Sequence, residues 1–168
     1  MQGIGKGWIY KVLKEILGGE YCGAPSSTDM IFGKFNSCLD NKILIFLDEL
    51  TWGGNHGDAS KLKQLVTEEE ILIGQKYCDD RTIKNYTKFI ISSNGDWIID
   101  AETEKDRRYS VISVNDDLRN LTRDETTKIH DKIFDNIIHI AKFLYTYDYK
   151  QTSLRDPIIT SAFRKQIE

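Results

Sequence analysis

The feature that most constrains the fold is a run of five apolar residues, Ile43–Leu47, within the segment Lys42–Leu47 that is bounded by Asn41 and Asp48. A half-buried strand alternates apolar and polar residues, whereas an unbroken run of this length is typical of a strand buried on both faces. Strands are buried on both faces when helices cover a parallel sheet. The run therefore predicts an α/β fold, with a mostly parallel sheet and flanking helices.

Two further segments have the composition of buried strands. Lys88–Ser93 ends at the turn signal Asn94-Gly95, and Tyr109–Val114 is rich in β-branched residues. Ile71–Ile73 and Gln75–Tyr77 form a strand-like stretch before the first of these. A turn at residues 79–81 and a return strand from residue 82 would make that stretch a β-hairpin.

Apolar residues at helical spacing predict the helices. The first begins after Lys6 and stops at Gly18-Gly19, Ala59–Val66 is short, and Glu125–Tyr145 is the longest. Met30–Leu39 is compatible with another short helix. The predicted buried face of the first helix consists of Ile9, Val12, Leu13, Ile16 and Leu17. That of the longest consists of Ile129, Ile133, Ile137, Ile140 or Ala141, and Leu144.

Composition excludes several classes of protein. The 168 residues, 40% hydrophobic, suffice for one domain or a large part of one. With 23 basic and 26 acidic residues the net charge is −3, so any nucleic-acid contact must be local. Three cysteines without a C-x-x-C pair and three histidines without ligand spacing argue against a zinc site or a disulfide framework. Without a signal peptide or a long apolar run, the sequence predicts a soluble, intracellular protein.

The first residues have the pattern of a phosphate-binding loop, G-x-x-x-x-G-K-[ST], without its first glycine. Such a loop directs backbone N–H groups and a lysine at phosphate oxygens, at the positive end of the following helix. The residues predicted to contact a nucleotide are Gly3, Ile4, Gly5, Lys6, Gly7 and Trp8. Gly7 stands where Ser or Thr normally offers a hydroxyl to Mg²⁺. Taken alone, the motif is equally compatible with a glycine-rich helix start.

Polar side chains follow the first two predicted strands and precede the third. Asp48 and Glu49 come after the first, where one carboxylate can hold Mg²⁺ and the second can activate water; a helix-capping pair is the alternative. Asn94 can face the ligand crevice at the carboxyl end of the second strand, or belong to a simple turn. Arg107 and Arg108 can reach a neighbouring subunit's phosphate, or form a solvated basic pair.

Together these motifs resemble the superfamily 3 helicases. The likeness is carried by GIGKG, FGKFN, ILIFLDEL, KLKQLVT, ILIGQKYCDDRTIKNYTKFIISSN and DRRYSV, and extends from residue 1 to about Val114. It is strongest to the poxvirus-type primase-helicases of large DNA viruses, phages and plasmids, which are AAA+ ATPases. The resemblance implies a P-loop NTPase fold, ATP and Mg²⁺ as cofactors, a homo-hexameric ring around single-stranded DNA, and in some members a fused primase. It divides the chain into an ATPase core, residues 1–120, and a C-terminal helical segment, residues 121–168.

The resemblance also assigns roles. Lys6 would bind phosphates, Asp48 Mg²⁺, Glu49 the attacking water and Asn94 the γ-phosphate. Arg107 or Arg108 would be the arginine finger of the neighbouring subunit. The alternative from another class is a P-loop module that binds nucleotide without turnover and serves in oligomerisation, which Gly7 favours. A small P-loop kinase is disfavoured by Asn94 and the paired arginines.

The predicted hairpin is where such helicases hold DNA. Lys76, Arg81 and Lys84 are the cations available for phosphates, and Tyr77 can stack on a base. Asp79-Asp80 at the tip opposes this, and a solvated hairpin is the alternative.

The resemblance finally implies a strand missing from the sheet. The AAA+ strand order 5-1-4-3-2 places the first strand before the phosphate loop, between the strand that precedes Asn94 and the strand that follows the arginines. Without it two inner strand edges stay unpaired. We therefore expect poor stability of this segment alone, and a cooperative, high-temperature thermal transition would contradict that expectation. An ATPase assay on a version extended upstream by about one βα unit would separate the motor from the non-catalytic module.

Overall fold

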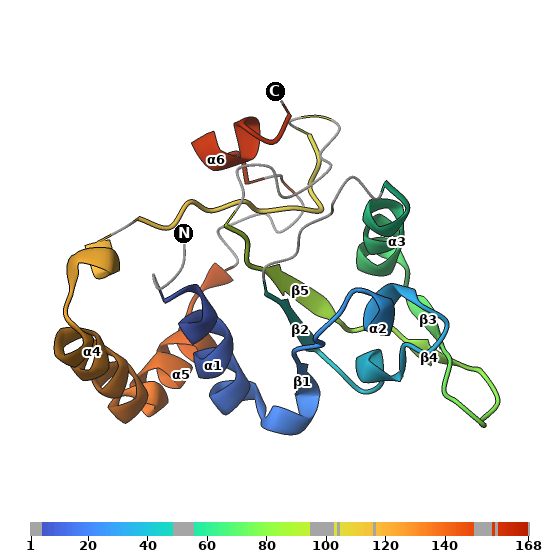
Figure 1. Ribbon diagram of the computed structural model, residues 1–168, viewed down its shortest axis with the longest axis horizontal. Helices are drawn as coiled ribbons and strands as arrows, with labels where there is room; N and C mark the ends of the chain where they lie inside the picture. The colour runs from blue at the N-terminus through green and yellow to red at the C-terminus, as the bar shows by residue number, and fades with distance from the viewer. Residues whose placement is uncertain are drawn as a thin grey trace.

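A small parallel sheet organises the molecule. The computed structural model describes residues 5–48, 56–94, 103, 105–115, 117–149, 156 and 158–167. Three strands lie in the order β1 (Cys22–Gly23), β2 (Leu44–Leu47) and β5 (Lys88–Ile91), and both neighbouring pairs are parallel (Figure 1). The predicted α/β class with a parallel sheet is confirmed at this level, and the finer P-loop NTPase fold stays a prediction.

The central strand is the run that opened the sequence analysis. All four residues of β2 are buried, as predicted for a strand covered on both faces. Leu47 lies opposite Ile91 of β5, and the ladder continues as the Ser92 N–H donates to the Leu47 carbonyl at 2.8 Å. The carboxyl ends of β2 and β5 therefore meet at one edge of the sheet.

Two helices cover opposite faces of β2 because its side chains alternate in direction. Helix α1 (Lys6–Leu17) packs Tyr10 on Phe46, with ring centroids 4.9 Å apart and nearly parallel planes. Helix α3 (His56–Thr67) inserts Leu62 into the core cluster that contains the strand's other side chains. Among the described residues, the buried cluster consists of Ile31, Phe32, Leu39, Ile45, Leu47, Ala59, Leu62, Ile71, Ile73, Tyr109 and Phe163.

The first helix is present as predicted, but its apolar face is not buried. Val12, Leu13 and Ile16 are half-buried, whereas the side chain of Ile9 is 54% exposed and that of Leu17 38%. The reason is that the sheet under α1 is small and α5 is its helical neighbour, so part of the helix surface stays uncovered (Figure 1).

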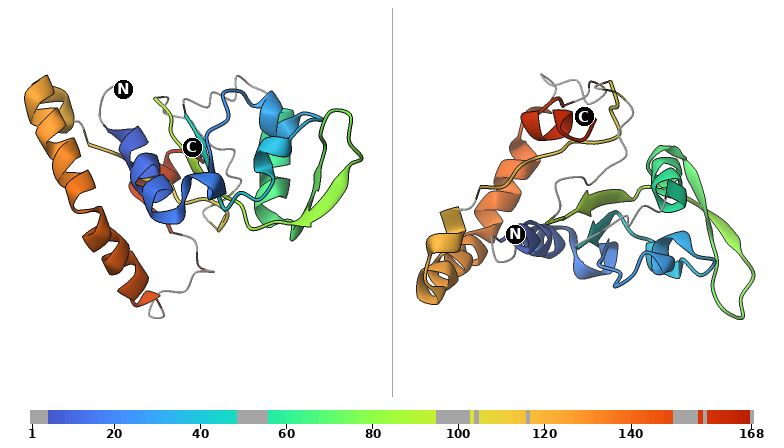
Figure 2. Two further views of the ribbon diagram at one scale, coloured as in Figure 1. Left: turned by 90° about the horizontal axis from the view of Figure 1, so that it is seen from below. Right: turned by 45° about the horizontal axis from the view of Figure 1, so that its top comes forward.

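The predicted hairpin is confirmed. Strands β3 (Glu70–Ile73) and β4 (Arg81–Lys84) pair antiparallel. Gln75–Tyr77 is not part of a strand as predicted, because these residues belong to the connecting turn, which extends from the edge of the molecule (Figure 2). Within that turn Tyr77 has a left-handed backbone (φ 62°) and a fully exposed side chain, and Cys78 is exposed.

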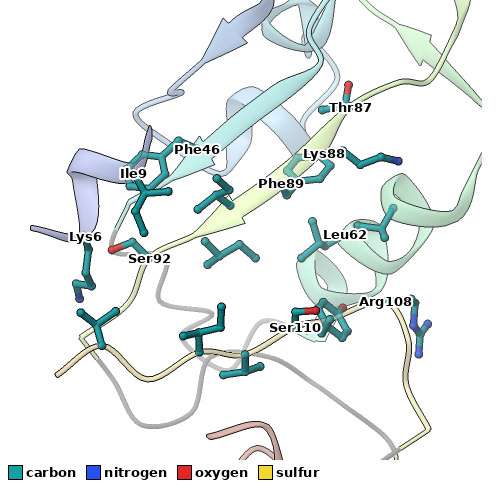
Figure 3. A pocket seen from close by; sticks show the side chains of 17 residues that line it. Lys6, Ile9, Phe46, Leu62, Thr87, Lys88, Phe89, Ser92, Arg108 and Ser110 are labelled. Carbon is teal, nitrogen blue, oxygen red and sulfur yellow. The ribbon is translucent and has the colours of Figure 1, made fainter. Parts of the chain in front are cut away.

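The third predicted strand, Tyr109–Val114, is not a strand. A strand requires a hydrogen-bonded neighbour, and this segment pairs with none of the described strands. It passes instead along the far side of an apolar groove from β5 (Figure 3).

The prediction of one continuous helix over residues 125–145 is wrong. It consists of α4 (Arg123–Asp135) and α5 (Ile137–Thr146), separated at Asn136. The Asn136 side chain donates to the carbonyl of Lys132 at 2.8 Å, and this local bond competes with the helical ladder. The predicted apolar face is half-buried up to Ala141, and Leu144 is exposed.

The remaining elements are short. The segment predicted as a helix at residues 30–39 is divided into α2 (Asp29–Phe32) and the 3₁₀ turn η2 (Ser37–Leu39). The other 3₁₀ turns are η1 (Gly19–Tyr21) and η3 (Asp117–Asn120). Among the described residues, no helix has the length and apolar content needed to cross a membrane.

The C-terminal residues return to the core. Helix α6 (Ser161–Arg164) places Phe163 in the main cluster with no exposed surface. Thr160 caps this helix and also donates to the carbonyl of Val111 at 2.5 Å, which ties the end of the chain to the 109–114 segment. The division of the chain at residue 120 stays a prediction.

Candidate functional site

Lys6 reaches the end of a strand that is distant in sequence. Gly5 has a left-handed backbone (φ 76°) that only glycine adopts without strain, and α1 begins directly after it. The Lys6 ammonium donates to the carbonyl of Ser93 at 2.5 Å and to Oδ1 of Asn94 at 2.6 Å. Two predicted site residues, 88 positions apart, are thus in direct contact.

Asp48 belongs to the same edge of the sheet. It follows β2 directly and is exposed, and β2 is paired in register with β5, which leads to Asn94. The structure therefore brings together the amine of Lys6, the amide of Asn94 and the strand end that carries Asp48. Gly3, Ile4 and Glu49 lie outside the described residues.

The residues at this edge fit a phosphate group. The first turn of α1 holds no acidic residue, and its N-cap residue, Gly5, has no side chain with which to cap the N–H groups. Such a helix end, with an ammonium beside it, favours an anion. Gly7 and Trp8 complete that first turn, and a Cβ added at Gly7 meets no heavy atom within 4 Å.

The carboxyl edge of β2 and β5 has the ligands for Mg²⁺ only if a bound nucleotide supplies further oxygen ligands. The described residues contain no group of three or more His, Cys, Asp or Glu that could hold a metal ion. Nucleotide-bound Mg²⁺ takes one or two carboxylates and completes its shell with phosphate oxygens and water, for which Asp48 suffices.

The two predicted arginines have different environments. Arg108 donates twice to the buried carboxylate of Asp106, from Nε at 2.8 Å and from Nη2 at 2.7 Å. Burial raises the pKa of Asp106, but these bonds and the charge of Arg108 outweigh it, so the pKa lies below its ordinary value. Arg107 is exposed.

A groove separates β5 from the 109–114 segment. It has a volume of about 450 Å³ and is lined mainly by apolar residues, among them Ile9, Phe89 and Val111. Lys6 and Arg108 lie at opposite ends of it (Figure 3). The second edge of β5 faces this groove, and no described strand pairs there. This is the place where the helicase resemblance puts the additional strand.

The predicted DNA-binding residues are dispersed along the hairpin. Lys76 lies in the turn, with its ammonium 5.6 Å from the centroid of the Phe35 ring. Arg81, at the start of β4, forms an ion pair with Asp40, so its charge is partly neutralised. Lys84 is exposed at the other end of β4.

Three features of the site and the hairpin were not predicted from the sequence. The first is Asp106, which binds the Arg108 guanidinium. The sequence signal that could have indicated this pair is the position of Asp106, two residues before Arg108. Phe35 and Lys34 belong to the FGKFN stretch, whose residue types do not indicate a contact with the hairpin, because that contact depends on tertiary packing. The role of the Ser93 carbonyl is a backbone contact, which residue types do not reveal.

Comparison with known proteins gives three related findings. The model of a family of unknown function, DUF5906, matches residues 1–108. The DNA primase-polymerase of Nitratiruptor phage NrS-1 is 28% identical over 173 residues, which cover 99% of this chain and 23% of that protein.

Solved structures of the NrS-1 C-terminal region without ligand are similar throughout. One has a TM-score of 0.84 at 26% identity, and an A-form structure has 0.82 at 28%. In both, the similarity covers 99% of this chain and 40% of the other. The chain thus spans less than half of the relatives it matches.

Proposed function

We propose that this chain, which belongs to the DUF5906 family, is the ATP-driven motor part of a viral or phage DNA replication protein. The observation that carries the proposal is the contact of Lys6 with Asn94 at the carboxyl edge of β2 and β5. Ligands of open α/β sheets bind at this edge, and a lysine at a helix start is suited to the phosphates of ATP. The similarity to a primase-polymerase supports the replication context.

In this proposal each residue has a distinct task. Lys6 neutralises phosphate charge, and its present partners, Ser93 and Asn94, would then lie beside the γ-phosphate. Asp48 would hold Mg²⁺, which when bound neutralises charge on the phosphates. Glu49 would orient the attacking water, and translocation on DNA would follow from hydrolysis between subunits of a homo-oligomeric ring.

The geometry favours Arg107 over Arg108 as the residue that reaches a neighbouring subunit. Arg108 is engaged by the buried Asp106, and withdrawing it would leave that carboxylate without its two strongest bonds. Arg107 is exposed and follows directly after this anchor, so the Asp106–Arg108 pair fixes the backbone from which Arg107 extends.

One observation favours a second candidate, a module that binds nucleotide without hydrolysing it. Gly7 offers no hydroxyl to Mg²⁺, so Asp48 would be the protein ligand of the metal, and nucleotide phosphates and water would supply the others. The two candidates agree on nucleotide binding and differ on turnover.

Nucleotide binding is tested by titrating a fluorescent ATP analogue in the presence of Mg²⁺. Lys6→Ala should weaken binding at least about tenfold, because it removes a charge-assisted contact to phosphate. Lys11→Ala, an exposed lysine on the same helix, should bind as the wild type does. Equal affinities for all three proteins would exclude a nucleotide site at Lys6.

Turnover is tested by ATP hydrolysis with and without single-stranded DNA. The motor predicts DNA-stimulated hydrolysis that Glu49→Gln abolishes without loss of ATP binding. Arg107→Ala should reduce hydrolysis by about 10³-fold. Mixing the Glu49→Gln and Arg107→Ala proteins should restore part of the activity if sites are shared between subunits. Binding without hydrolysis in the wild type would instead establish the non-catalytic module.

A further inference from the structure

Two oxygen atoms hold the ammonium of Lys6 at the end of β5. It donates to the carbonyl oxygen of Ser93 at 2.5 Å, in a partly buried contact, and to Oδ1 of Asn94 at 2.6 Å at the surface. Lys6 is the first residue of α1, whereas Ser93 and Asn94 lie just after β5. The two bonds therefore tie the start of this helix to the end of that strand, across the edge at which a nucleotide would bind.

Hydrogen-bond chemistry fixes the orientation of the Asn94 amide in this contact. An ammonium is a donor only, so the amide must present its oxygen to Lys6 and turn its nitrogen elsewhere. The oxygens of a nucleotide phosphate are acceptors and need donors in the same place. The present orientation of Asn94 thus suits Lys6 and opposes a phosphate, because it would set one acceptor against another.

We propose that the bonds from Lys6 to Ser93 and Asn94, here called the Lys6 latch, are autoinhibitory: they occupy the phosphate-binding ammonium, and a nucleotide must open them before its phosphates reach Lys6. This inference rests on the proposed function, because it concerns regulation of the same site. Both oxygens of the latch are neutral, and an anionic phosphate forms a stronger bond with an ammonium than they do. The latch therefore lowers the affinity for nucleotide without abolishing binding.

The expected inhibition is modest and belongs to the association step. Asn94 is exposed, so water competes with Lys6 for its oxygen. The apparent affinity falls by the fraction of molecules whose latch is open, because only these accept the nucleotide. Opening requires side-chain rotation alone, which is fast compared with the encounter of protein and ligand. The latch should therefore lower the association rate constant and leave the dissociation rate constant unchanged.

The contact itself is tested without nucleotide, by a double-mutant cycle in thermal melting. Lys6→Ala removes the donor, and Asn94→Leu keeps roughly the volume of the side chain without its acceptor. The variant with both substitutions should lose less melting temperature than the two single variants together, because either one already breaks the bond. Lys11→Ala, an exposed lysine on the same helix, should be additive with Asn94→Leu. Additivity in both cycles would overturn the latch.

Inhibition is tested by stopped-flow binding and equilibrium titration of a fluorescent ADP analogue. ADP lacks the γ-phosphate, so the contact proposed between that group and Asn94 does not enter the comparison. Asn94→Leu should raise the association rate constant and the affinity about fivefold, with an unchanged dissociation rate constant. Lys11→Ala should bind as the wild type does. An affinity gain confined to dissociation, or no gain in Asn94→Leu, would overturn autoinhibition.

Failure of the latch is distinguishable from failure of the proposed function. ADP binding that Lys6→Ala weakens and Asn94→Leu does not strengthen would keep the nucleotide site and exclude the latch. The fivefold gain in a protein that hydrolyses no ATP would establish the latch and exclude the motor. Absence of ADP binding in the wild type and in Asn94→Leu alike would overturn both proposals.

Discussion

At the scale of single residues, Gly7 is the position where a small change has the clearest consequence. It lies in the first turn of α1 in open space, so a larger side chain can be added without a clash. We predict that Gly7→Thr strengthens Mg²⁺-dependent binding of the ATP analogue several-fold, because it supplies the hydroxyl of the usual loop. Titration with and without Mg²⁺ measures this. An equal gain without Mg²⁺ would mean that the hydroxyl acts on the helix alone.

Asp106 makes stability depend on pH. Its pKa in the folded protein is below the ordinary value of 3.8, so its stabilising contribution is present above pH 3.8 and is lost as the pH falls through the folded pKa. We predict that Asp106→Asn lowers the free energy of unfolding by about 2 kcal/mol at pH 7. Urea unfolding at pH 7 and pH 3 should show the difference from the wild type shrinking in acid. The exposed Glu15→Gln should show no comparable loss at pH 7.

At the scale of elements, the start of α4 is fixed by a capping box. The Glu125 N–H donates to the Thr122 hydroxyl, and the Glu125 carboxylate accepts from the Thr122 N–H at 2.8 Å. We predict that Thr122→Ala destabilises the protein by about 1 kcal/mol. Thr127→Ala is the matched control, since its hydroxyl bonds only within the helix, to the carbonyl of Arg123. Thermal melts followed by circular dichroism compare them; equal melting temperatures would mean that α4 is not coupled to global stability.

Elements were predictable where local pattern and tertiary burial agree. The apolar run Ile43–Leu47 is typical of a strand buried on both faces, and Leu44–Leu47 forms such a strand. Tyr109–Val114 has the same local character, yet forms no strand, because strand formation depends on a partner that its own residues do not specify. Asn136 divides a long apolar pattern because its side chain bonds to the backbone, an effect that periodicity does not register.

At the scale of the whole molecule, the last residues are part of the central core. Phe163 has no exposed surface and packs in the same cluster as Leu62 and Ile31. We predict that Phe163→Ala lowers the free energy of unfolding by about 3–5 kcal/mol, through lost burial and the cavity left behind. Chemical unfolding followed by tryptophan fluorescence measures it, with the exposed Phe143→Ala as the control. An equal effect of the two substitutions would contradict a shared core.

In the candidate site, too, some features can be predicted from the sequence and others depend on tertiary contacts. Asp48 and Asn94 follow β2 and β5 as the strand pattern predicts, and both lie at one edge because parallel strands bring their carboxyl ends together. The distinction between Arg107 and Arg108 was not accessible, since it depends on which guanidinium meets the buried Asp106. The hydrogen bond from the Asn36 side chain to the carbonyl of Leu72 in the hairpin likewise depends on tertiary packing that neither segment reveals alone.

The turn between β3 and β4 also has a chemical consequence. Cys78 is exposed there, two residues from Lys76, whereas Cys22 is buried and Cys38 is half-buried. Burial raises the pKa of the Cys22 and Cys38 thiols, which lowers their fraction of reactive thiolate. A maleimide dye should therefore attach first at Cys78, so the native chain carries its own labelling position for testing whether an oligonucleotide binds at the hairpin.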